Sequence, residues 1–137
     1  MARILIADDH RDTADTMLEF FETHGYQAET AYDGLSALEA IFSFDPEVVL
    51  LDLSMPYVTG FQVAVAMRER SQGRQTLLVA VSGDAHADLS VRVAQAGFHH
   101  FFPKPANLAT LLQLAETAVR WQIASRVNSS RQRAAVQ

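Results

Sequence analysis

Residues 48–56 read Val-Val-Leu-Leu-Asp-Leu-Ser-Met-Pro, and this stretch decides the fold. Four consecutive β-branched or leucine residues without polar alternation predict a strand buried on both faces, as central strands of parallel sheets are. The apolar run ends at Asp52, and Pro56 prevents further sheet pairing. Because ligands of open parallel sheets bind beyond the carboxyl ends of the strands, Asp52 stands where a functional site is expected.

Further apolar runs predict four more strands and five helices. Residues 3–7 and 76–81 read as buried strands, 27–31 as a weaker strand at or near an edge, and 100–102 as an edge strand because prolines follow it. Helical apolar stripes lie at about residues 14–24, 35–44, 61–73, 87–96 and 108–122. Strands that alternate with helices predict an α/β domain whose parallel sheet is covered on both faces.

The helix ends carry their own signals. Asp33 and Asn107 are predicted to cap the second and fifth helices. Gly25 and Gly97, each followed by an aromatic residue, are predicted to end the first and fourth. From about Ile123 the apolar period fades, so we divide the chain into a domain at 1–122 and a basic helix extension or flexible tail at 123–137.

Composition limits the class of protein. A chain of 137 residues with 49% hydrophobic residues suits one domain, and the absence of cysteine excludes disulfides and thiolate metal sites. No apolar run approaches the length of a signal core or a membrane span, so we expect a soluble cytoplasmic protein without membrane contact.

The charge is unevenly distributed. Residues 1–116 hold seven basic and all 16 acidic residues, a net charge of −9, whereas residues 117–137 hold four arginines and no acid. An acidic body disfavours nucleic acid as its partner and suits a cation site. The basic tail fits a solvated helix end, a linker to an output domain, or a nucleic-acid contact.

Polar residues follow four of the predicted strands. They are Asp8 and Asp9 after the first, Asp52 after the third, Ser82 after the fourth, and Lys104 after the fifth. Two carboxylates about 5 Å apart repel by roughly 3 kcal/mol at an effective dielectric of about 20, and Lys104, the only lysine, cannot neutralise three. With oxygen ligands and no His or Cys at a useful spacing, the expected ion is Mg²⁺.

This group of residues suits phosphoryl chemistry. A carboxylate beside such an ion can act as the nucleophile that takes a phosphoryl group as an acyl phosphate. Ser82 would then donate a hydrogen bond to one phosphoryl oxygen, and Lys104 would pair with another.

In their order along the chain these motifs resemble the receiver domain of two-component response regulators, the chemotaxis-regulator-like family. The matching residues are Asp8-Asp9, Asp52 in Asp-Leu-Ser-Met-Pro, Gly60, Ser82 in Val-Ser-Gly, and Lys104-Pro105. The resemblance covers residues 3 to about 121. It implies a flavodoxin-like (βα)5 fold, with a five-stranded, doubly wound parallel sheet in the order 2-1-3-4-5.

The resemblance also implies roles for individual residues. Asp52 would be the phosphoacceptor and would bind Mg²⁺ with Asp8, Asp9 and the backbone carbonyl of Ser54. Ser82 and Lys104 would complete the catalytic set, and the Lys104-Pro105 bond would be cis.

Ser82 and Phe101 would form the switch that alters a partner surface made by the helix at 87–96, the strand at 100–102 and the fifth helix. Phe101 departs from the tyrosine common at this position and lacks its hydroxyl, and Pro103 is unusual before the lysine. Ser54 and Asp84 occupy positions that tune hydrolysis of the phosphoryl group.

The expected function is therefore transfer of a phosphoryl group from a sensor histidine kinase to Asp52, followed by slow self-catalysed hydrolysis, in a monomer or weak homodimer. Such a protein is not a conventional enzyme. The stretch at residues 96–105 also resembles receivers of hybrid histidine kinases, so a phosphorelay intermediate that passes the group to a histidine phosphotransfer protein is the alternative.

Competing classes fit less well. A phosphatase with an aspartyl nucleophile would need a second acid two residues after Asp52, where Ser54 stands. A dinucleotide-binding enzyme would need a glycine-rich turn after the first strand, where the acidic pair Asp8-Asp9 stands. Asp8 and Asp9 could instead merely cap the first helix.

Overall fold

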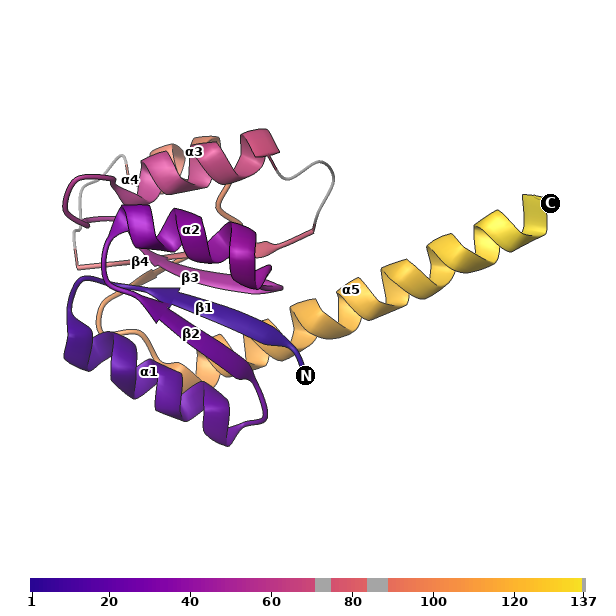
Figure 1. Cartoon of the computed structure of the whole chain (residues 1–137), viewed down its shortest axis with the longest axis horizontal. Helices are drawn as coiled ribbons and strands as arrows, with labels where there is room; N and C mark the ends of the chain where they lie inside the picture. The colour runs from indigo at the N-terminus through magenta and orange to yellow at the C-terminus, as the bar shows by residue number, and fades with distance from the viewer. Residues whose placement is uncertain (71–74, 84–88, 137) are drawn as a thin grey trace.

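The computed structural model describes residues 1–70, 75–83 and 89–136 and forms one five-stranded parallel sheet in the order β2-β1-β3-β4-β5 (Figure 1). The strands are β1 (Arg3–Ala7), β2 (Gln27–Ala31), β3 (Val48–Asp52), β4 (Leu77–Ser82) and β5 (His100–Pro103). The helices are α1 (Arg11–Thr23), α2 (Gly34–Phe44), α3 (Gly60–Arg70), α4 (Leu89–Ala96) and α5 (Leu108–Val136).

Helices cover both faces of the sheet. Ile4 and Ile6 of β1 pack with α1 and α5, whereas Leu5 and Ala7 pack with α2, α3 and α4. This alternation follows from the two-residue period of a strand, and it explains why β1, β3 and β4 read as continuous apolar runs. The predicted α/β class and strand order are therefore confirmed, with β3 and β4 inside the sheet and β2 and β5 at its edges.

Predicted helix ends are also confirmed. The Asp33 Oδ1 accepts a hydrogen bond from the Ser36 N–H (2.8 Å), and the Asn107 Oδ1 accepts one from the Thr110 N–H (3.0 Å). Gly25 and Gly97 have φ values of 89° and 99°. Glycine adopts this left-handed conformation without the clash that a Cβ would cause, and so it ends α1 and α4.

Of the two alternatives predicted for residues 123–137, a helix extension or a flexible tail, the structure has the helix extension. The helix continues to Val136 and extends beyond the body of the domain (Figure 1). Residues 123–136 contain neither glycine nor proline, so helix propensity persists after the packing period is lost. The predicted end of the third helix near Gly73 and start of the fourth near Ala87 lie outside the described residues, as does Asp84.

No helix within the described parts of the chain has the combination of length and hydropathy needed to cross a lipid bilayer.

The loop from β3 to α3 contains a strained tyrosine. Tyr57 has φ 66°, and the Val58 N–H donates to the Pro56 carbonyl (2.8 Å), which closes a three-residue γ-turn around it. The Tyr57 side chain is 95% exposed, so it gains no burial there.

We expect Tyr57→Gly to raise the free energy of unfolding by about 0.5–1 kcal/mol. Relief of the left-handed strain on a non-glycine residue exceeds the entropy that glycine adds to the unfolded chain. Urea denaturation measures the change. Tyr57→Ala removes the same ring but keeps the strain, and equal stabilisation by both variants would contradict this explanation.

Candidate functional site

The site lies at the carboxyl end of the sheet, where β1 and β3 are neighbours although β2 and α2 separate them in the chain. Here the direction of strand order reverses, and open parallel sheets bind ligands at such a switch point. Asp8 and Asp9 directly follow β1, and Asp52 is the last residue of β3. The side chains of Asp8 and Asp52 are almost fully buried.

Lys104 brings the two buried carboxylates together. Its Nζ lies 2.8 Å from the Asp8 Oδ2 and 3.3 Å from the Asp52 Oδ2. The lysine follows β5, and its N–H donates to the Ser82 carbonyl at the end of β4 (2.8 Å). The Lys104-Pro105 bond is cis, as the resemblance implied. One ammonium group thus forms ion pairs with two carboxylates that follow or end different strands.

Backbone groups orient Asp52. Its Oδ1 accepts a hydrogen bond from the Ser54 N–H (3.1 Å). The Gly60 N–H donates to the Leu53 carbonyl, and a Cβ at Gly60 would lie 2.4 Å from the Asp52 carbonyl oxygen. Only glycine allows α3 to begin so close to the end of β3, so the prediction that Gly60 opens the next turn has a steric cause.

The carboxylates differ in their affinity for protons. Burial, with a further contribution from the negative charge of Asp8, raises the pKa of Asp52 to about 6. Burial acts on Asp8 in the same direction, but its hydrogen bonds to Lys104 and His10 and the lysine charge lower the Asp8 pKa overall. Both acids raise the pKa of Lys104 against the effect of its burial. Asp8 and Lys104 therefore stay charged near neutral pH, and of the two buried carboxyl groups Asp52 protonates more readily than Asp8.

The raised pKa of Asp52 predicts that Asp52→Asn stabilises the metal-free protein. The folded carboxyl binds its proton more tightly than the unfolded one, so a penalty develops as pH rises from 3.8 to about 6 and persists above. At about 1.4 kcal/mol per pKa unit this penalty approaches 3 kcal/mol.

We therefore expect Asp52→Asn to raise the free energy of unfolding by up to about 3 kcal/mol at pH 7.5, and by much less at pH 4. Urea denaturation in EDTA at both pH values tests this. An equal effect at the two pH values would show that the carboxyl charge is not the cause.

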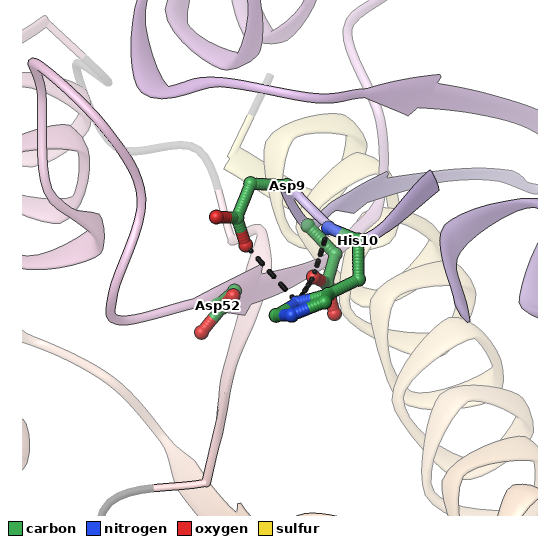
Figure 2. A group of neighbouring side chains, drawn as sticks. Asp9, His10 and Asp52 are labelled. Carbon is green, nitrogen blue, oxygen red and sulfur yellow. Dashed lines mark hydrogen bonds and ion pairs between the residues drawn. The ribbon is translucent and has the colours of Figure 1, made fainter. Parts of the chain in front are cut away.

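Three carboxylates and one ammonium leave an excess of negative charge that suits a cation. The Oδ1 of Asp9 is buried and accepts no hydrogen bond from the described residues. Potential ligand atoms of Asp8, Asp9, His10 and Asp52 all lie within 4.8 Å of one another. Figure 2 shows the Asp9 carboxylate and the His10 imidazole directed toward each other, with Asp52 beside them. The donor set therefore fits a divalent metal ion.

The expectation that no histidine stands at a useful spacing is wrong for His10, which joins the cluster. Its Nδ1 lies 3.3 Å from the Oδ1 of both Asp8 and Asp9. The Asp8 Oδ1 also accepts a hydrogen bond from the His10 N–H (2.9 Å), which turns the chain back toward the cluster. Spacing along a strand does not reveal this turn; the only signal in the sequence is that His10 directly follows the acidic pair.

The structure also places the remaining predicted site residues, Ser82, Phe101 and Ser54. Ser82 is buried at the end of β4, where the register pairs its neighbour Val81 with Asp52. Phe101 is half-buried in β5 and packs against the core on the side of α2, α3 and α4. The Ser54 side chain is exposed. The switch roles of Ser82 and Phe101 and the metal contact of the Ser54 carbonyl stay predictions.

Fold and site together define a class: a doubly wound α/β domain with an acidic cluster and a lysine at its topological switch point. The sequence profile of the response regulator receiver domain matches residues 4–116. The chain therefore belongs to the receiver domain family of the response regulators of two-component systems.

Individual relatives of this chain are also response regulators. Response regulator MprA of Mycobacterium ulcerans is 33% identical over 120 residues, which cover 86% of this chain and 50% of that protein. The chain thus spans about half the length of the curated relatives it matches.

Solved structures of receiver domain proteins also resemble the structure of this chain. A CheY-like receiver domain protein from Methanospirillum hungatei aligns with a TM-score of 0.82 at 26% identity, over 91% of this chain and 98% of that one. Chemotaxis protein CheY4 of Vibrio cholerae aligns with a TM-score of 0.79 at 28% identity, over 86% and 98%.

Proposed function

We propose that Asp52 accepts a phosphoryl group from a phosphohistidine of a sensor histidine kinase. Response regulators imply a sensor kinase as a partner in general, and receiver domains generally bind Mg²⁺. The single observation that carries the proposal is the position of Asp52. Asp52 is the last residue of the central strand β3. One oxygen of its carboxylate accepts a hydrogen bond from the Ser54 N–H, and the other lies 3.3 Å from the Lys104 ammonium.

The transfer uses these groups in defined roles. A carboxylate oxygen of Asp52 attacks the phosphorus, the bond from phosphorus to the histidine nitrogen breaks, and the donor leaves as a free imidazole. With a pKa of about 6, Asp52 is largely ionised at neutral pH and hence available as the nucleophile. Lys104 offsets negative charge on the phosphoryl oxygens, and the Ser82 hydroxyl donates to one of them.

Asp8, Asp9, Asp52 and the Ser54 carbonyl would hold the metal. When bound, Mg²⁺ supplies positive charge that offsets the carboxylates and the phosphoryl oxygens. The acyl phosphate is later lost when water attacks the phosphorus, which releases inorganic phosphate and regenerates the Asp52 carboxylate.

The new charge of about −2 at Asp52 would draw Ser82 toward the phosphoryl group and let Phe101 change its position in β5. Phe101 lies on the strand between α4 and α5, so its movement alters the surface formed by α4, β5 and α5. To change the ratio of the active to the inactive conformation from 1:99 to 99:1, phosphorylation must stabilise the active one by about 5.5 kcal/mol more than the inactive one.

Metal removal tests the proposal. We expect intact-protein mass spectrometry to detect one added phosphoryl group after incubation with acetyl phosphate and Mg²⁺, and none when EDTA replaces the metal. Reduction with borohydride followed by peptide mapping identifies the modified residue. Modification that is equal with and without metal, or that maps away from Asp52, would contradict the proposal.

A further inference from the structure

His10 gives the acidic cluster a nitrogen atom as well as oxygens. The residue lies in the turn between β1 and α1, and its backbone N–H is held by the Asp8 Oδ1. This contact directs the imidazole toward the Asp9 carboxylate (Figure 2), and its Nδ1 also lies close to the Asp8 carboxylate. Asp8, which is a metal ligand in the proposed function, thus also holds His10 in place.

The His10 Nδ1 and the Asp8 Oδ1 form a hydrogen bond, and the spacing of these atoms also fits ligands around a transition-metal ion. The His10 Nδ1 lies 3.3 Å from the Oδ1 of Asp8 and 3.3 Å from the Oδ1 of Asp9. Ligands that surround a tetrahedral ion at about 2.0–2.1 Å are separated from each other by about 3.3–3.4 Å. The Asp9 Oδ1 is a buried acceptor that receives no hydrogen bond from the described residues, so an ion at this point would also satisfy it.

The exposure of the ring agrees with such a role. The His10 side chain is 72% exposed, although its Nδ1 faces the acids. A neutral imidazole that binds a metal through Nδ1 carries its proton on Nε2, and here the exposed edge of the ring can donate that proton to water.

We infer that His10 is a ligand of this metal site through Nδ1, with Asp8 and Asp9, and that it shifts the preference of the site from Mg²⁺ toward Zn²⁺ and similar transition-metal ions. Imidazole nitrogen suits Zn²⁺, whereas Mg²⁺ prefers oxygen ligands and keeps several waters. The inference rests on the proposed function only for the presence of a metal site.

Calorimetric titration with Zn²⁺ and, separately, with Mg²⁺ at pH 7.5 tests the inference on the full chain. We expect His10→Ala to weaken Zn²⁺ binding at least about 10-fold and Mg²⁺ binding less than about twofold. The matched control is His100→Ala, which removes an exposed histidine of β5 outside the cluster and should leave both affinities unchanged. Unchanged Zn²⁺ affinity in His10→Ala, or an equal loss for both ions, would overturn the inference.

If His10→Ala does not fold, a spectroscopic measurement on the wild-type protein tests the same inference. In ¹H–¹⁵N correlation spectra of the five imidazoles, Zn²⁺ should shift the Nδ1 resonance of His10 far more than Mg²⁺ does. Shifts confined to other histidines would exclude His10 as a ligand. Neither experiment uses phosphorylation, so failure of Asp52 to accept a phosphoryl group would refute the proposed function and leave this result standing.

Discussion

Asp52→Asn is expected to abolish phosphoryl incorporation, with a loss of at least about 1,000-fold in the rate of modification. The asparagine amide has nearly the same shape as the carboxylate and can still accept a hydrogen bond from the Ser54 N–H. It has no anionic oxygen to attack phosphorus. The same change removes a buried charge, so the variant should be folded and more stable than the wild type. Loss of reaction in a stabilised protein cannot be attributed to unfolding.

Intact-protein mass spectrometry over a time course with acetyl phosphate and Mg²⁺ measures this effect. Asp12→Asn is the matched control, because Asp12 is an exposed acid in the first turn of α1 and its replacement makes the same change in net charge. The control should react like the wild type. If Asp52→Asn gained as much phosphoryl mass as Asp12→Asn, Asp52 would not be the acceptor.

Lys104→Ala is expected to slow phosphorylation of Asp52 by about 100- to 1,000-fold. The variant leaves Asp8 and Asp52 without their shared cation and removes a group that offsets phosphoryl charge in the transition state. We also expect the acidic cluster to bind protons more readily, because the lysine no longer holds down the pKa of Asp8.

The conservative variant Lys104→Arg separates charge from geometry. Arginine keeps the positive charge but presents a rigid planar fork in place of a compact ammonium that reaches both acids. We expect Lys104→Arg to recover stability more fully than reactivity, as judged by urea denaturation and by the same mass time course. Full reactivity of Lys104→Ala would show that the lysine is not part of the reaction.

Much of the fold was predictable because each strand carries its own burial pattern. Val48 to Leu51 read as a doubly covered strand, and β3 is paired on both sides. The prolines after Phe102 predicted an edge, where β5 lies. For residues 123–137 the sequence left a helix extension and a flexible tail as alternatives, since fading periodicity reports the loss of a packing partner and not the loss of helix propensity.

The candidate site was predictable in its members that stand at strand ends. Asp8, Asp9, Asp52 and Lys104 follow strands whose carboxyl ends must meet at one edge of a parallel sheet, so their convergence followed from sheet geometry. His10 was missed because its approach depends on hydrogen bonds to Asp8 between neighbouring residues, and no periodic pattern encodes such contacts.

The sequence by itself determined which groups at the strand ends meet, because burial patterns and strand ends are local properties of the chain. Only the tertiary structure decided how those groups share charge. Burial raises the pKa of Asp52, whereas Asp8 keeps a lowered pKa despite its burial because Lys104 lies closer to it and His10 also bonds to it. Coulomb interactions and desolvation depend on distances of a few ångströms between residues far apart in the chain, and those distances exist only after folding.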